Sequence, residues 1–228
     1  MWLINSSVGK KVVMSVTGIA LVCFLAFHMC MNCVALFSEP SYNAVCKFLG
    51  ANWYALVASA ILGLLVLIHF VYAFWLTMLN RKARGTQRYE VTEKPKSVEW
   101  ASQNMFVLGL IVIGGLLLHL CNFWMKMQLN EIIKIYPNVD PTDGVALIKE
   151  TFGTWWLALL YIVWLCALWF HLTHGFWSAL QTLGWSNQTW FARWRVIGNI
   201  CVTLLVLGFV AVIAAFFFQG VCGCGASC

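Results

Sequence analysis

Five long stretches of this chain contain no Asp, Glu, Lys or Arg, and they constrain its fold more than any other feature. They cover residues 12–38, 48–80, 100–125, 151–192 and 196–228. Each exceeds the roughly 20 apolar residues that a helix needs to cross the hydrocarbon core of a bilayer. We therefore predict an all-α membrane protein, a single domain with five transmembrane helices over residues 12–37, 53–79, 101–125, 151–183 and 196–219. The first four helices are expected to form a bundle.

Composition supports this class. Only 10% of the 228 residues are charged and the mean hydropathy is +0.82, whereas about a quarter of the residues of a soluble domain are charged. A transmembrane β-barrel would show alternating apolar and polar residues instead of continuous apolar runs.

The basic residues are divided unevenly between the two sides that five spans create. Ten lie on the side of the N-terminus and four on the other: Lys10, Lys11, Arg81, Lys82, Arg84, Arg88, Lys94, Lys96, Arg193 and Arg195 against Lys47, Lys126, Lys134 and Lys149. Cytoplasmic loops carry the excess of Lys and Arg, so the N-terminus is expected in the cytoplasm and the C-terminus outside. Topology and anionic lipid account for the net charge of +6, and no nucleic-acid binding is expected. The polar loop 85–99 is the predicted docking surface.

All five histidines lie within the charge-free stretches, where ionisable side chains usually mark a proton path, a ligand site or a metal. Helix rise places His28 and His119 roughly 25–28 Å from the cytoplasmic ends of their helices. It places His69 and His174 roughly 15–18 Å from the same side. Four helices thus supply imidazoles in two pairs at two depths.

Two imidazoles from facing helices, one on each side of a ring, are the axial ligands that a haem in a helix bundle requires. The depths therefore predict two haems, with His28 and His119 on one iron and His69 and His174 on the other. A single intramembrane histidine is more often a hydrogen-bonding residue or a proton relay, so the prediction depends on finding four.

The choice between two neighbouring histidines decides the inner pair. His171 is three residues before His174 on nearly the same helix face and competes for the same role. We expect His174 to be the ligand because of its depth and the adjacent Gly175, and His171 to be a hydrogen-bond partner or proton carrier. Gly115 and Gly175 are expected to let a porphyrin approach the helix backbone.

Several segments together resemble a known family over nearly the whole chain. They are Ser6-Ser-Val-Gly-Lys10 with Ser15-Val-Thr-Gly18 and His28; Ile68-His69-Phe-Val-Tyr72 with Asn80-Arg-Lys-Ala-Arg84; Asn104-Met105 through His119-Leu-Cys-Asn122-Phe-Trp124; and His171-Leu-Thr-His174-Gly-Phe-Trp-Ser-Ala-Leu-Gln181-Thr-Leu-Gly184. In this combination they resemble the cytochrome b membrane-anchor subunit of succinate dehydrogenase and fumarate reductase, in its single-chain, five-helix, two-haem form.

The resemblance implies a function. His69 and His174 would hold the proximal haem b, nearer the cytoplasm, and His28 and His119 the distal haem b. A flavoprotein subunit, which carries the dicarboxylate site, and an iron-sulfur subunit would dock on the cytoplasmic face of the bacterial inner membrane. Electrons would pass between the iron-sulfur subunit and a quinone, expected to be menaquinone, whose site is on this chain. A homodimer of complexes is compatible with this assembly.

Four further side chains are candidates for the site. Glu39, in the short outer loop, is a candidate proton carrier at the quinone site, with a solvated loop carboxylate as the more frequent alternative. Ser15, Thr17 and Arg81 lie near the cytoplasmic end and could contact haem propionates. Positive-inside topology alone also explains Arg81.

Two other functions fit part of the pattern. One is the b-type cytochrome subunit of another quinone-linked dehydrogenase or hydrogenase, which also pairs histidines across helices. The other is a haem-free transporter that uses the histidines for proton coupling, although transporters usually show repeats and broken helices.

Overall fold

The computed structural model describes residues 6–50, 52–84, 100–185 and 187–225, in which every regular element is a helix. Five helices are long and apolar enough to cross a membrane, which confirms the predicted all-α, multi-pass class. They are α2 (Ser7–Cys33) extended by η1 (Val34–Leu36), α4 (Trp53–Arg84), α6 (Met105–His119) continued by η2 (Leu120–Leu129) and α7 (Asn130–Ile133), α9 (Trp155–Thr182) and α10 (Trp190–Gly225). The shorter helices are α3 (Glu39–Phe48), α5 (Trp100–Gln103) and α8 (Gly144–Phe152).

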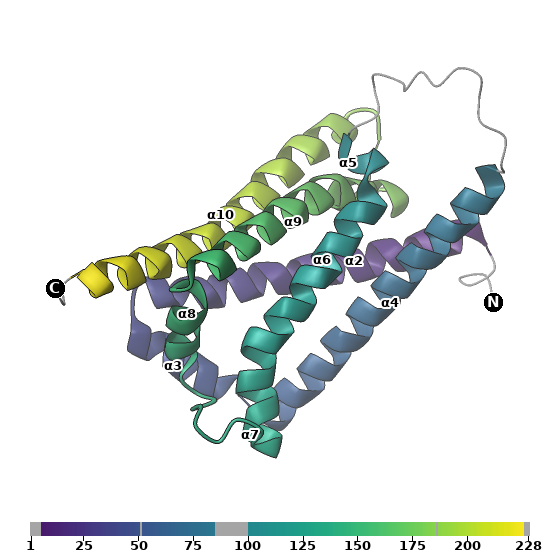
Figure 1. The fold of residues 1–228 in the computed structure, drawn as a ribbon. Coiled ribbons are helices and arrows are strands. Elements are labelled where there is room, and N and C mark those ends of the chain that lie inside the picture. The colour runs from purple at the N-terminus through teal and green to yellow at the C-terminus, as the bar shows by residue number, and fades with distance from the viewer. Residues whose placement is uncertain (1–5, 51, 85–99, 186, 226–228) are drawn as a thin grey trace.

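The long helices form one bundle around α9 and α2. Helix α9 packs against α10, α2 and α6, and α2 also packs against α4 and α10. Figure 1 shows α3 and α8 together at the end of the bundle where α10 finishes, with α5 at the opposite end. We call the end with α3 and α8 the capped end. The other, where α2 and α10 begin and α4 and α9 finish, is the basic end.

The buried core lies between α9 and α10 and reaches the capped end. Buried side chains of α9, such as Tyr161 and Leu165, pack with buried side chains of α10, such as Val206 and Phe216. Helix α4 contributes little to this core, since its long apolar side chains are mostly exposed. In a membrane such side chains face lipid, where an apolar surface costs nothing.

Local sequence signals set the helix ends. Ser6 begins α2, because its hydroxyl oxygen accepts a hydrogen bond from the Gly9 amide at 2.9 Å. Gly184 ends α9 with a φ of +84°, and the Trp185 amide donates to the Leu180 carbonyl at 3.0 Å. This is the glycine-terminated helix end that favours a residue without a Cβ atom.

The outer connections are more helical than predicted. The segment after the first span folds as α3, which begins with a cap from Ser38 and has Pro40 in its first turn. The predicted fourth span, 151–183, begins instead at Trp155, because α8 ends at Phe152 and the chain turns through Gly153. The third span extends past residue 125 as a π-helix, η2, a geometry often found next to functional sites.

Candidate functional site

The structure brings His28 of α2 and His119 of α6 together inside the bundle. Their ring centres lie 5.7 Å apart and their ring planes are nearly perpendicular, at 81°. His119 is the last residue of α6, directly before the π-helix η2. We call His28 and His119 the outer pair.

Aromatic rings surround the outer pair. His28 is stacked on Phe24 with ring centres 5.4 Å apart and also contacts Phe209 of α10 at 5.7 Å. His119 contacts Phe123 at 5.2 Å and Trp164 of α9 at 5.9 Å. The fifth helix thus takes part in the site through Phe209, which the sequence prediction of a four-helix site missed.

The space beside Gly115 holds a side chain of the protein itself. A Cβ atom on Gly115 would overlap the indole ring of Trp164, whose Nε1 donates a hydrogen bond to the Val112 carbonyl at 3.0 Å. Gly115 therefore allows α9 to approach α6 closely. Its predicted role, to make room for a porphyrin, stays a prediction.

The inner level pairs His69 of α4 with His171 of α9. Their ring centres are 6.4 Å apart and the planes are inclined at 66°. Glycines of neighbouring helices lie beside both rings: a Cβ atom on Gly18 would be 3.3 Å from Cε1 of His69, and one on Gly109 would be 3.8 Å from Cε1 of His171. We call His69 and His171 the inner pair.

Thr17 orients the His69 ring. Its hydroxyl donates to the Val13 carbonyl at 2.8 Å and lies 3.1 Å from Nδ1 of His69. Because the single hydroxyl proton is engaged by the carbonyl, the oxygen accepts from Nδ1–H, which leaves Nε2 with its lone pair free. A metal-binding imidazole usually has this arrangement, with its other nitrogen donating to a fixed acceptor. The sequence predicted that Thr17 contacts a haem propionate. In the structure, its hydroxyl contacts the His69 ring.

Replacing Thr17 by valine should therefore disturb the inner pair specifically. Valine keeps the shape of the side chain but removes the hydroxyl beside Nδ1 of His69, at a cost of about 1–3 kcal/mol. Thermal unfolding in detergent should show this loss for Thr17→Val and less than about 1 kcal/mol for Thr17→Ser, which keeps the hydroxyl. Equal losses for the two variants would contradict the hydrogen-bond role.

His171 and His174 lie in different surroundings. Nδ1 of His171 is buried and has no hydrogen-bond partner among the described residues. Burying an imidazole nitrogen without a hydrogen-bond partner costs free energy. A nitrogen that serves as a ligand to a metal has no such partner within the protein. The His174 ring instead contacts Trp177, with ring centres 5.1 Å apart and planes at 85°. A Cβ atom on Gly175 would face Met105. The structure thus places the His171 ring beside His69, where the sequence predicted His174.

The basic end supplies cations above the inner pair. The Lys10 side chain is 9% exposed and its ammonium lies 4.4 Å from the centre of the Trp75 ring. The Arg81 guanidinium lies 5.2 Å from the centre of Phe106, and Ser15 is buried in α2. Lys10, a buried lysine at the basic end, was not selected from the sequence as a site residue, where it was counted only for topology.

Each histidine pair offers two imidazole nitrogens, so an ion bound there would need further ligands. A bond between imidazole nitrogen and a metal is about 2 Å long, so two imidazoles on opposite sides of one ion have ring centres roughly 6 Å apart. Both observed separations are close to this value. The described residues contain no group of three or more His, Cys, Asp or Glu that could hold a metal alone. An ion between these pairs would need other donors, such as the four nitrogens of a porphyrin.

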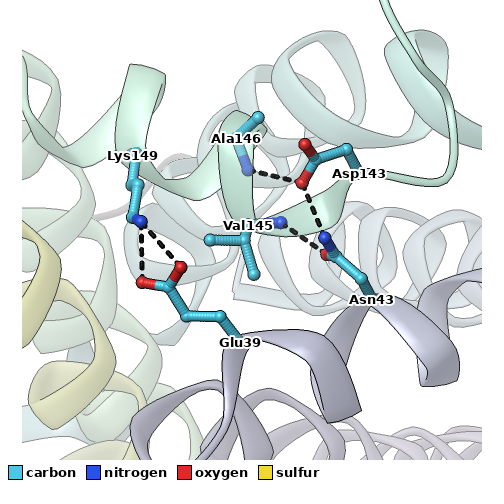
Figure 2. Close-up of polar contacts among 6 residues, drawn as sticks. All are labelled: Glu39, Asn43, Asp143, Val145, Ala146 and Lys149. Carbon is cyan, nitrogen blue, oxygen red and sulfur yellow. Dashed lines mark hydrogen bonds and ion pairs between the residues drawn. The ribbon is translucent and has the colours of Figure 1, made fainter.

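Glu39 lies on the capped end, in a polar cluster that joins α3 to α8 (Figure 2). Its carboxylate forms an ion pair with Lys149 at 2.7 Å, and both side chains are nearly half exposed. Beside it, the Asn43 amide nitrogen donates to Asp143 at 2.8 Å and its oxygen accepts from the Val145 amide at 3.0 Å. The structure therefore gives Glu39 a partner on α8, and its predicted part in proton transfer remains a prediction.

The two kinds of contact in this cluster should differ in strength. Exposed ion pairs usually contribute less than about 1 kcal/mol. Removing Asn43 leaves the buried Val145 amide at the start of α8 without a hydrogen-bond acceptor, at about 1–3 kcal/mol. We expect Asn43→Ala to lower the free energy of unfolding by that amount and Glu39→Gln to lower it by less than about 1 kcal/mol. Thermal or denaturant unfolding in detergent measures both. A larger loss for Glu39→Gln would mean that the ion pair, and not Asn43, holds α3 on α8.

The predicted docking loop, 85–99, lies outside the described residues. No family model matches the chain, and comparisons with curated proteins and with solved structures gave no match either.

Proposed function

We propose that this chain is the di-haem b membrane-anchor subunit of a succinate:quinone oxidoreductase or quinol:fumarate reductase. The observation that carries the proposal is the presence of two facing imidazole pairs, His28 with His119 and His69 with His171, at two levels of one membrane-embedded bundle. Depth supports two separate sites. Thr17, which contacts His69 of the inner pair, lies on the same helix as His28 of the outer pair. The two residues are eleven positions apart, or roughly 16 Å along the helix.

In this proposal the inner pair is His69 with His171. Three observations favour His171 over His174: its ring lies across from His69, its Nδ1 is buried without a partner among the described residues, and Gly109 leaves space beside it. His174, one turn nearer the basic end and packed on Trp177, would border the site.

The chain's own residues would hold each group in place. The four histidines would each hold haem iron through a ring nitrogen, and Thr17 would fix the His69 ring and keep its Nε2 unprotonated. Lys10 and Arg81 would provide positive charge for carboxylates at the basic end. Haem iron held by two imidazoles exchanges single electrons, and its potential depends on ligands, hydrogen bonds and burial. The aromatic rings around His28 and His119 would exclude water and lower the local polarity there.

Partners and location complete the proposal. The basic end would face the cytoplasm of a bacterium and dock an iron-sulfur subunit and, through it, a flavoprotein with the dicarboxylate site. A membrane quinone, expected to be menaquinone, would exchange electrons and protons with this chain. The uneven distribution of Lys and Arg supports this orientation.

Helix continuity weighs against the transporter alternative. Helices α2, α4 and α9 run unbroken through their histidines, whereas transporter sites are usually formed by interrupted helices. The b-type cytochrome subunit of another quinone-linked enzyme would use the same histidine pairs, so only the partners separate it from the proposed function.

Purification from the source membranes in mild detergent tests the assignment of the complex. A tagged chain is expected to bring with it a flavin-containing protein and an iron-sulfur protein, and the preparation should reduce quinone with succinate or oxidise quinol with fumarate. A preparation with haem and hydrogenase or formate dehydrogenase activity would instead favour the alternative electron-transfer complex.

A further inference from the structure

A chain of hydrogen bonds connects the outer pair to the capped end. The hydroxyl of Tyr42, on α3, donates to Oδ1 of Asn32 at 3.0 Å. The Asn32 amide nitrogen donates to the backbone carbonyl of His28 at 2.8 Å and lies 3.4 Å from Nδ1 of the same residue. Asn32 is one turn after His28 on α2, so two side chains, Tyr42 and Asn32, connect α3 to the ring that faces His119.

Helix α8 fixes Tyr42 from the other side. Tyr42 is only 8% exposed, and a Cβ atom on Gly144, the first residue of α8, would be 2.9 Å from Cε1 of the Tyr42 ring and would overlap Sγ of Cys46. The start of α8 is therefore pressed against the tyrosine. Asn43, the next residue of α3, is bonded to Asp143 and to the Val145 amide (Figure 2). The position of Tyr42 thus depends on how α3 is docked on α8.

The chemistry of Tyr42 suits it to this place. Burial raises the pKa of its phenol above the usual range, so the hydroxyl keeps its proton and can both donate and accept hydrogen bonds. With Asn32 oriented as observed, its N–H points to Nδ1 of His28, and the ring proton then resides on Nε2. A metal at Nε2 requires the other tautomer, with Asn32 turned to present its oxygen to Nδ1–H. In that orientation Asn32 gives up its hydrogen bond to the His28 carbonyl, while the Tyr42 hydroxyl can accept from the Asn32 amide nitrogen.

We propose that Tyr42 and Asn32 are positioning residues that hold the His28 ring in its orientation toward His119 and make that orientation dependent on the docking of α3 on α8. Neither touches His119 or a reacting atom; both act through His28. Within the proposed function, which this inference builds on, they would set the properties of the outer haem site and leave the inner pair unaffected.

Tyr42→Phe is the direct test, because it removes one oxygen atom and keeps the buried ring. The matched control is Tyr54→Phe, whose hydroxyl on the same side of the bundle donates to the Phe48 carbonyl and takes no part in the His28 connection. The first readout is the ¹⁵N NMR spectrum of histidine-labelled, chemically reduced full-length protein, in which His28 is assigned by its loss in His28→Gln. We expect Tyr42→Phe to shift the His28 ring resonances and to leave those of His69 and His171 in place, while Tyr54→Phe shifts none of them.

Asn43→Ala tests the dependence on docking, since it loosens α3 on α8 without touching Tyr42. A shift of the His28 resonances in the same direction as in Tyr42→Phe, but smaller, would support the coupling. An unchanged His28 signal in Tyr42→Phe would overturn the proposal, and so would equal shifts of the inner-pair histidines in that variant.

A second readout separates this inference from the proposed function. If the chain carries haem, Tyr42→Phe should shift the midpoint potential of one haem and leave the other unchanged. If it carries none, the proposed function fails, yet the NMR comparison still decides whether Tyr42 positions His28. Two haems whose potentials are both unchanged in Tyr42→Phe would overturn the inference and leave the proposed function standing.

Discussion

Replacing His171 by alanine is expected to remove the inner haem and leave the outer one. His171 is the imidazole whose ring faces His69, at a ring separation of 6.4 Å. A haem that would be held by two histidines is expected to bind less tightly when one of them is removed. The haem content of purified His171→Ala should therefore fall from two to one per chain, and His69→Ala should give the same result.

His174→Ala is the control for this experiment. Its ring packs on Trp177, so its loss should disturb the basic end but leave two haems per chain. This expectation reverses the one drawn from helix depth and the adjacent Gly175. Loss of a haem from His174→Ala, with both retained in His171→Ala, would restore His174 as the ligand.

Replacing Gly115 by alanine is expected to be strongly destabilising. Its Cβ atom would overlap the Trp164 indole, which cannot move away without breaking its hydrogen bond to the Val112 carbonyl. Overpacking of this kind costs about 1–3 kcal/mol and the lost hydrogen bond about 1 kcal/mol more. Because Trp164 also contacts His119, the outer pair should be disturbed together with the contact between α6 and α9.

Gly114→Ala provides the matched comparison, one residue earlier on the same helix. No atom lies within 4 Å of its added Cβ in the described structure. The variant should therefore unfold at the temperature of the unmodified protein or slightly above it, since alanine favours a helix. Thermal unfolding in detergent compares the two. Similar unfolding temperatures for Gly115→Ala and Gly114→Ala would mean that Trp164 is free to move aside.

The class of fold and the level of the histidines could be predicted because both follow from simple periodic rules. Long charge-free stretches predict membrane helices, and a constant rise per residue places His28 and His119 at one level. Their rings lie 5.7 Å apart. The helices α3 and α8 escaped prediction because their signals are short: a capping Ser38, a Pro40 in the first turn, and a capping Asp143.

The sequence could not predict that His171 is the histidine of α9 whose ring lies beside His69. His171 and His174 are three positions apart on one helix, so depth and helix face nearly coincide. What separates them is the rotation of α9 relative to α4, which depends on close packing such as that of Trp164 on Gly115. The role of Thr17 as partner of His69 likewise depends on the crossing of α2 and α4. A neighbouring helix supplies each of these contacts, and no local pattern encodes it.

In the proposed function, imidazoles from facing helices would hold two haems within this bundle. A reduced-minus-oxidised spectrum of the purified chain, combined with a haem assay and a redox titration, tests it most directly. The expected result is two b-type haems per chain that titrate with two distinct midpoint potentials. A preparation that is folded, as judged by cooperative unfolding, but contains no haem even after reconstitution with haem in detergent would contradict it.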